Sequence, residues 1–464
     1  MSGQDTKQQI GVGSLTMFMI CAVIVLDTLT ASAAIGPSAF AWWGIMLIGF
    51  VLPYTLVVTE LGTTWPAEGG IYDWVKRAFG DRMAARTSYL YWINVGLWMP
   101  SVYILFAGTF ASLYWPGMNI NWQILMCLAL TWLTVWFCNI STTVCISIAR
   151  WGAWAKIIVI VTLGIAGINQ AIQHGLANDL QLHNLIPHFN EASHFLPAII
   201  YSLLGLELVA CMGKLIKKPE KTMPRAMLAA ALLIALLYLF GTLGILAALP
   251  VDKISLVSGI IDALKILFGQ SLASKVMLNI LCLLTLFTFI SNMVTWTSGS
   301  SRAAAEAAQS GDLPKPLGKR SKKFDTPVGA NIATGLVSTL VILCYSQFAS
   351  GNNDLFWLIF SFSSCIFLLP YFLLFTAWFW LRYSAPQVQR PYRVPGGKPG
   401  QWLVVSLGLL FILQGVVLFI FPDLLEGKIE AKHSLPIITG LAVTLLIGEL
   451  CLLRFHRKTL RTGI

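Results

Sequence analysis

Two carboxylates inside apolar segments are the first residues of this sequence that could do chemistry. Asp27 lies within VIVLDTLTASAAIGP, and Glu207 lies within YSLLGLEL. A carboxylate near the middle of a membrane costs roughly 2.5–3.5 kcal/mol on insertion scales, so it is a functional candidate. Each could bind an ammonium group or respond to protons. Alternatively, a neighbouring donor neutralises it and it only fixes packing.

The surrounding composition is that of a chain embedded in lipid. Of the 464 residues, 57% are hydrophobic and 11% are charged, and residues 28–59 and 87–149 contain no Asp, Glu, Lys or Arg. A helix that crosses the hydrocarbon core needs roughly 20 apolar residues. We therefore predict an all-α, polytopic membrane protein with about twelve transmembrane helices. The expected spans are residues 14–36, 41–62, 87–114, 122–144, 154–173, 194–213, 226–249, 273–299, 328–348, 355–381, 402–421 and 434–453.

The positive charge is distributed unevenly between the two sides of these spans. With the N-terminus on one side, most of the 31 Lys and Arg residues fall on that same side. The opposite side holds Lys253, Lys265, Lys275, Lys428 and Lys432. The positive-inside rule then places both termini in the cytoplasm. The formal net charge of +11 follows from this topology, so we expect a lipid bilayer and no nucleic acid as a partner.

Two of the predicted spans contain residues that interrupt helices. TLTASAAIGP, residues 28–37, concentrates small and hydroxylated residues before Gly36 and Pro37, and Ser202 and Gly205 precede Glu207. Interrupted spans of this kind mark the binding sites of secondary transporters. In such a site, exposed helix N-termini attract a carboxylate and exposed carbonyls attract an ammonium group.

Other classes of membrane protein leave signals that we do not find. The nine cysteines show no metal-ligand spacing, and no His-Glu-x-x-His motif is present, so we expect no metal, no cofactor and no enzyme. A nucleotide-binding glycine loop is missing, which argues against ATP-driven pumping. A channel would need a charged ring or a filter of backbone carbonyls, and we find neither motif. Conduction that does not saturate would distinguish a channel from a carrier.

Five motifs, taken in order, resemble the amino acid–polyamine–organocation superfamily, in particular its bacterial amino acid antiporters. GLELVACMGKLIKKPEKTMPRAM is similar to the family's sixth span and the turn after it. The others are EGGIYDWVKRAFG (68–80), TWTSGSSRAAAEAAQSGDLP (295–314), DTPVGA (325–330) and SFSSCIFLLPY (361–371).

The resemblance implies a LeuT-like fold, in which two inverted five-helix repeats have discontinuous helices 1 and 6. It divides the chain into a cytoplasmic tail (1–13), a first repeat (14–173), an outer loop (174–193), a second repeat (194–384), helices 11 and 12 (385–453) and a cytoplasmic tail (454–464). It also implies a bacterial inner membrane and a monomer or homodimer.

The resemblance further implies exchange of an amino acid against a related amino acid or its decarboxylated amine, by alternating access. The alternative is proton-coupled symport, or uniport, on the same fold. By position, Tyr201 and Trp296 would be aromatic walls or gates, and Glu207 a gating or proton-responsive carboxylate. Asn94, Leu204 and Ser361 would face the substrate. Neither the exchanged pair nor the coupling ion follows from the sequence.

One departure from the family bears on the substrate. Where the family has a Gly-Ser-Gly-like break in the first span, this chain has Thr30, Ala31 and Ser32. Unwinding is harder without glycine, and the acid of Asp27 on the site side favours an ammonium group over a carboxylate. The substrate is therefore expected to carry an amine, as a cationic amino acid or amine does.

Three further charges lie near the predicted span ends. Lys156, at the start of the fifth span, is expected to reach the cytoplasmic surface as an anchor. In some relatives a lysine of this span replaces a sodium ion with a titratable ammonium group, so a gating or proton-coupling role for Lys156 stays open. Glu60 and Glu449 are expected to be solvated at the interface.

Overall fold

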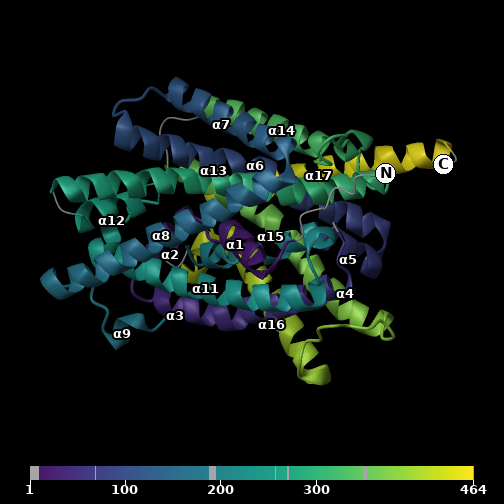
Figure 1. The fold of residues 1–464 in the computed structure, drawn as a ribbon, viewed down its shortest axis with the longest axis horizontal. Coiled ribbons are helices and arrows are strands. Elements are labelled where there is room, and N and C mark those ends of the chain that lie inside the picture. Colours follow the sequence, from purple (N-terminus) through teal and green to yellow (C-terminus); the bar gives the residue numbers. More distant parts are fainter. Residues whose placement is uncertain are drawn as a thin grey trace, which may run out of the picture.

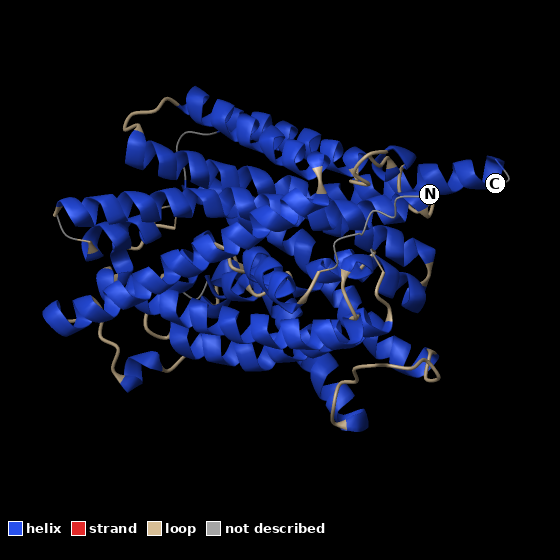
Figure 2. Cartoon of the chain, in the orientation of Figure 1, coloured by secondary structure: helices blue, strands red, loops and turns tan. Residues whose placement is uncertain are grey.

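The chain folds almost entirely into helices, because backbone N–H and C=O groups in lipid must be satisfied within the segment itself. The computed structural model describes residues 10–67, 69–187, 195–256, 258–268, 271–348 and 353–462, and Figure 2 shows no strand among them. A single bridge, Ile10 to Ile216, ties the start of this part to the end of the sixth span.

The main helices follow one another with short connections. They are α1 (Val12–Val23), α2 (Leu26–Ala33), α3 (Ala39–Met46), a π-helical turn η1 (Leu47–Val51), α4 (Leu52–Thr64), α5 (Ile71–Phe79), α6 (Asp81–Tyr114), α7 (Ile120–Ile140), α8 (Thr142–His174), α9 (Leu182–Leu185), α10 (Leu196–Ser202), the 3-10 helix η3 (Leu206–Leu215), α11 (Pro219–Ala248), α12 (Gly259–Leu267), α13 (Leu272–Gln309), α14 (Val328–Phe348), α15 (Asn353–Ser384), α16 (Gly397–Ile420) and α17 (Ala431–Thr462). Short 3-10 turns lie at Val251–Lys253, Lys315–Gly318 and Pro422–Glu426.

The number of crossings agrees with the sequence. Within the described residues, 10 helices are long and apolar enough to cross a membrane, and Val12–Val23 and Val328–Cys344 are shorter apolar helices. Several helices extend beyond the predicted spans; α6 begins at Asp81 and α13 continues to Gln309. Hydropathy reports the lipid-embedded length, whereas a helix can continue into water with charged residues. The division into two inverted repeats stays a prediction.

The broken first span lies in the centre of the bundle. Figure 1 shows α1 at the centre of the view, and it packs on α8, α11 and α13. α7 and α14 pack side by side at one edge. Their outer side chains are apolar and exposed, as at Trp136 and Leu340, which suits contact with lipid chains.

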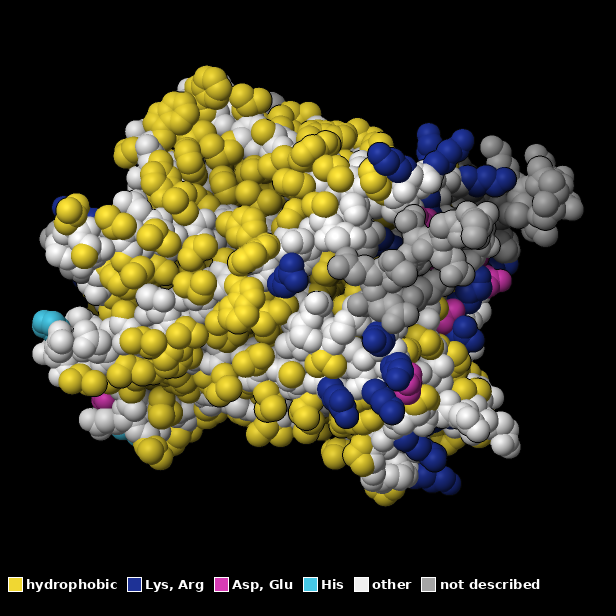
Figure 3. Space-filling model, viewed as in Figure 1, with side chains coloured by type: hydrophobic (Ala, Val, Ile, Leu, Met, Phe, Trp, Pro, Cys, Tyr) yellow, Lys and Arg dark blue, Asp and Glu magenta, His cyan; other side chains and the backbone are white. Residues whose placement is uncertain are grey.

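Lysines and arginines gather at one end of the bundle, which we call the basic end (Figure 3). The last described helix, α17, extends toward it (Figure 1). Its exposed cations include Lys217, Lys218, Lys221, Arg225, Lys322 and Lys323. This asymmetry is the one that the sequence predicted.

Candidate functional site

The first span is interrupted at Ile24 and Val25, whose backbone is extended between α1 and α2. A helix end leaves its last carbonyls without partners in the helix. In this structure, side chains of other helices donate hydrogen bonds to these carbonyls. Trp296 Nε1 donates to the Ala22 carbonyl at 2.9 Å, and the Tyr238 hydroxyl lies 2.9 Å from the Val23 carbonyl.

Lys156 is buried at this break, so the expectation of a surface anchor was wrong. Its side chain is 1% exposed. Its ammonium group donates to the carbonyl of Cys21 at 2.5 Å, to that of Ile24, and to Asn292 Oδ1 at 2.8 Å. A cation at the C-terminal end of a helix is electrostatically favoured. The carbonyls exposed by the break supply acceptors that a lysine in lipid would lack.

The sequence placed the break of the first span within residues 28–37, but only the end of that range is non-helical: α2 runs to Ala33, and the break between α1 and α2 lies earlier, at Ile24 and Val25. Thr30, Ala31 and Ser32 lie inside α2. The Thr30 hydroxyl donates to the Leu26 carbonyl at 3.2 Å, and that of Ser32 to the Thr28 carbonyl at 2.5 Å. These hydroxyls therefore bond the turn before them and leave the helix intact. Whether the three residues touch a substrate stays a prediction.

Val23, Ile24 and Val25 are β-branched, which favours extended backbone. The longer β-branched run at residues 157–162 nevertheless stays helical in α8, so the local sequence did not mark the break. Asp27 is the second residue of α2, just beyond that break. Its side chain lies outside the described part of the structure. Gly36, with φ of 89°, lies just beyond the end of α2, as the sequence suggested.

The sixth span is interrupted where the sequence predicted. α10 ends at Ser202, and Leu203, Leu204 and Gly205 lead into η3. Gly205 has φ of 118°, and a Cβ there would lie 2.8 Å from the Trp296 ring. Only glycine combines this positive φ with the absence of a Cβ atom that would clash with the ring. Leu204 is buried in this break.

Five aromatic rings surround the breaks and form what we call the aromatic box: Trp98, Tyr201, Trp296, Phe360 and Phe367. Ring centroids are 5.0 Å apart for Tyr201 and Phe360, and 5.8 Å for Tyr201 and Trp98. They are 6.0 Å apart for Trp98 and Trp296, and 5.1 Å for Trp296 and Phe367. Tyr201 and Trp296 were predicted and are brought together here. The other three rings were missed.

Asn94 lies on the same helix as Trp98, one turn away. It is fully buried, and neither its amide oxygen nor its amide nitrogen has a hydrogen-bond partner among the described residues. The Trp98 indole N–H is buried and unpaired as well. Buried polar groups are normally satisfied, so this pair is suited to meet a polar solute. Ser361 is buried next to Phe360 on α15.

Glu207 is fully buried on the basic side of the sixth-span break and accepts hydrogen bonds from three tyrosines. Tyr91 donates at 2.6 Å, Tyr371 at 2.7 Å, and Tyr54 donates to the other carboxylate oxygen. The three hydroxyls come from α6, α15 and α4. We call this group the Glu207 cluster. Sequence reasoning found the acid but missed the tyrosines, because they are distant in the chain.

Glu60 is also buried, so the expected solvated position was wrong. It pairs with Arg382 and, at 3.3 Å, with Arg390, and it accepts from the Val394 N–H at 2.7 Å. A buried carboxylate needs such partners. The group ties the end of α4 to the end of α15 and the loop after it. Glu449 fits the expectation better, since it is half exposed and pairs with Arg86 at 2.5 Å.

Two of the quoted motifs meet at the basic end. Tyr72 and Lys76 of EGGIYDWVKRAFG both donate to Asp312 Oδ2 of the GDLP segment, at 2.6 and 2.8 Å. Burial and the bond to Asp312 raise the pKa of Tyr72 to about 12. The short helix α5 is thereby fixed to the end of α13.

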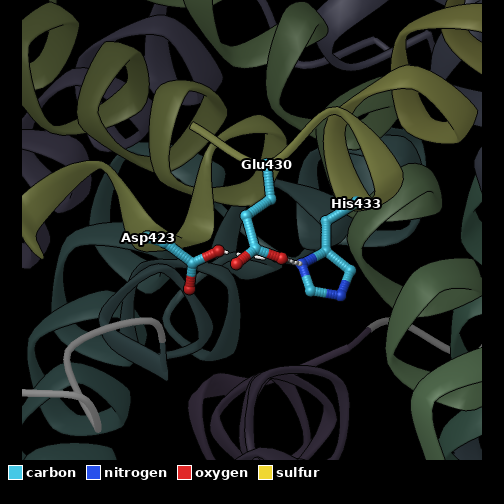
Figure 4. Close-up of side chains that lie close together, drawn as sticks. All are labelled: Asp423, Glu430 and His433. Atoms are coloured by element: carbon cyan, nitrogen blue, oxygen red, sulfur yellow. Dashed lines mark ion pairs between the residues drawn. The ribbon is translucent and has the colours of Figure 1, made fainter. Parts of the chain in front are cut away.

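Metal-ligating side chains meet once among the described residues, and away from the breaks. Asp423, Glu430 and His433 lie between and at the ends of α16 and α17 (Figure 4), with His433 Nδ1 at 3.7 Å from Asp423 and 3.6 Å from Glu430. All three are at least partly exposed. The ion pairs alone account for this grouping, and we assign no metal to it.

Comparison with known proteins agrees with this architecture. The family model described as amino acid permease matches residues 10–446. A protein named as a probable agmatine/putrescine antiporter from Lactococcus lactis is 32% identical over 97% of this chain and 96% of its own length. An uncharacterised transporter of Legionella pneumophila is 30% identical over 90% of each chain. A glutamate/gamma-aminobutyrate antiporter from Lactococcus lactis is 24% identical over 85% of this chain and 80% of its own.

The family match covers both helix breaks, the aromatic box and the Glu207 cluster. The resemblance read from the five motifs is therefore confirmed, and the chain is a multi-pass membrane protein that belongs to the amino acid permease family.

Proposed function

We propose that this protein exchanges one ammonium-bearing solute for another, an amine or a cationic amino acid, by alternating access. The relatives named as agmatine/putrescine and glutamate/gamma-aminobutyrate antiporters support exchange of small amines and amino acids. The observation that carries the proposal is the aromatic box, which lies against both interrupted spans.

The chemistry of the box suits a cation. An ammonium group within about 6 Å of an aromatic face is attracted by the ring quadrupole, and more strongly where water is excluded. Trp98, Tyr201 and Trp296 offer three such rings, all of them buried. The unpaired amide of Asn94 adds a hydrogen-bond acceptor on the same side of α6 as Trp98. The five residues of the box carry no positive charge, and the ammonium group of Lys156 at the neighbouring break is already bonded to two carbonyls and Asn292.

The Glu207 cluster is proposed as the gate between the aromatic box and the basic end. It joins α4, α6 and α15 to the sixth span on that side of the break. Glu60 and its arginines form a second closure farther along α4. Opening toward the basic end requires these contacts to separate. The basic end is proposed to face the cytoplasm of a bacterium, by the positive-inside rule.

Lys156 is proposed to act as a fixed cation that holds the first-span break, in place of a bound sodium ion. Its ammonium group already contacts two carbonyls and Asn292. Transport should therefore proceed equally in sodium, potassium or choline salts. Because one chain contains both breaks and the box, a monomer or a homodimer would suffice.

The test is uptake into vesicles that contain the purified protein. We expect labelled putrescine or agmatine to enter vesicles preloaded with an amine, and to enter empty vesicles far more slowly. Trp296→Leu should abolish this uptake, whereas Trp136→Leu, at a lipid-facing position, should leave it intact. Equal uptake into empty vesicles would exclude exchange and favour proton-coupled symport or uniport.

A further inference from the structure

A single tyrosine hydroxyl joins the two interrupted spans. Tyr238, on α11, accepts a hydrogen bond from the Val25 N–H at 3.2 Å. The same oxygen lies 2.9 Å from the Val23 carbonyl and 2.9 Å from the Ser202 carbonyl. Val23 and Val25 flank the first-span break, and Ser202 ends the first half of the sixth span. Tyr238 therefore contacts the exposed backbone of both breaks at once.

The tyrosine is held rigidly in this place. Its side chain is fully buried. The Trp43 ring stacks on it with centroids 4.4 Å apart and an interplanar angle of 19°. Trp43 is itself fixed, because its indole N–H donates to the Thr242 hydroxyl at 3.1 Å, one turn farther along α11. A substrate could displace this hydroxyl only by repacking α3 against α11.

The Val25 N–H is one of the groups that an interrupted helix offers to an anion. The N-terminal end of a broken span is where transporters of this architecture direct a substrate carboxylate, through unpaired N–H groups and the helix dipole. Val25 precedes the first residue of α2, and Tyr238 has already satisfied its N–H. A hydroxyl can accept there and donate to one carbonyl. The Tyr238 hydroxyl thus occupies the N–H group that a substrate carboxylate would bond, and one of the carbonyls that a substrate ammonium group would bond.

We propose that Tyr238 makes this protein select amines that lack a charged α-carboxylate, because its hydroxyl already bonds the N–H group that would stabilise that charge. This inference rests on the proposed function and narrows it to the decarboxylated class of substrate. An amino acid must either displace the hydroxyl or bring its carboxylate to a break where the Val25 N–H is already bonded and the Lys156 ammonium group is already bonded to two carbonyls and to Asn292.

The first experiment needs no mutation. Agmatine, arginine and argininamide share one side chain, and they differ in whether an α-carboxylate is absent, charged or neutralised. We expect arginine to compete for labelled agmatine uptake at least about tenfold more weakly than agmatine, as expected for the loss of one hydrogen bond to a charged group. Argininamide should recover most of that loss. If arginine matches agmatine, or if argininamide is as weak as arginine, the inference is wrong.

The second experiment removes the hydroxyl. Tyr238→Phe frees the Val25 N–H, so the preference for agmatine over arginine should fall about tenfold. Tyr103→Phe is the matched control, because Tyr103 is equally buried but bonds Thr134, between α6 and α7. The preference of the Tyr103→Phe protein for agmatine over arginine should not change. An unchanged preference in a folded Tyr238→Phe protein overturns the inference, whereas wild-type protein that exchanges neither amines nor amino acids refutes the proposed function itself.

Discussion

The Glu207 cluster gives the most direct test of how the basic end closes. Tyr91→Phe and Tyr371→Phe each remove one hydroxyl that donates to Glu207, at 2.6 and 2.7 Å, and leave the ring in place. The hydroxyls belong to α6 and α15, and the acid to the second half of the sixth span. Each substitution therefore weakens one contact between helices that must separate when the basic end opens.

The size of the effect follows from the burial of the group. Glu207, Tyr91 and Tyr371 are fully buried, so water does not replace the lost bond in the closed form. A hydrogen bond to a charged group contributes about 1.5–3 kcal/mol. If the open form lacks the bond, the closed form loses that stabilisation relative to it. The equilibrium then shifts toward opening by roughly 10- to 150-fold.

Cys211 can report this shift. It is fully buried in η3, one turn beyond Glu207, and a Cβ at Gly70 would lie 2.9 Å from its sulfur. In a protein whose other cysteines are replaced by serine, a membrane-impermeant maleimide should reach Cys211 only when the basic end opens. We expect its labelling rate to rise roughly 10- to 150-fold in either variant. Tyr103→Phe should not change it.

Unchanged labelling of Cys211 would contradict the proposed role of the tyrosine bonds. If both variants fold and label at the wild-type rate, the tyrosine bonds do not hold the basic end closed. The bonds would then only satisfy a buried acid, and the gate would have to be sought at Glu60 and Arg382.

Four further substitutions test the other buried groups and the glycine of the sixth-span break. Lys156→Met should lower the melting temperature and abolish exchange, because it leaves carbonyls unpaired at about 1–3 kcal/mol each. Glu60→Gln should lower the melting temperature more than Arg382→Met, since breaking a buried pair costs about 3–5 kcal/mol and a second arginine remains for Glu60. Gly205→Ala should cost about 1–3 kcal/mol from backbone strain and displace Trp296, which a smaller substrate-induced thermal shift would reveal.

The sequence predicted the membrane spans well because lipid imposes a simple rule on every residue of a crossing helix. It predicted the sixth-span break because Gly205 adopts a backbone conformation that other residues avoid. It misplaced the first-span break because small and hydroxylated residues, which can interrupt a transmembrane helix, gather at residues 28–37. In α2 such residues bond their own helix, as Thr30 and Ser32 do.

The parts of the site that sequence reasoning missed depend on contacts between residues far apart in the chain. Trp98 and Phe367 are ordinary aromatic residues in apolar helices, and nothing in their local sequence separates them from packing residues. The same is true of Tyr238, which lies 213 residues from Val25. Lys156 was misassigned because a lysine near a span end is usually an anchor, and only the fold places carbonyls within its reach.

The buried charges at the two helix breaks, Lys156 and Glu207, are stabilised in the same way. Lys156 lies at the C-terminal end of α1, where unpaired carbonyls carry partial negative charge, and Glu207 lies in the first turn of η3, where unpaired N–H groups carry partial positive charge. Each charge thus compensates one of the helix ends that the breaks expose. In the proposed site, the exposed helix ends are therefore already compensated before a substrate binds. What remains for it are aromatic faces and the Asn94 amide, which distinguish solutes by their ammonium group and shape and offer little to a carboxylate.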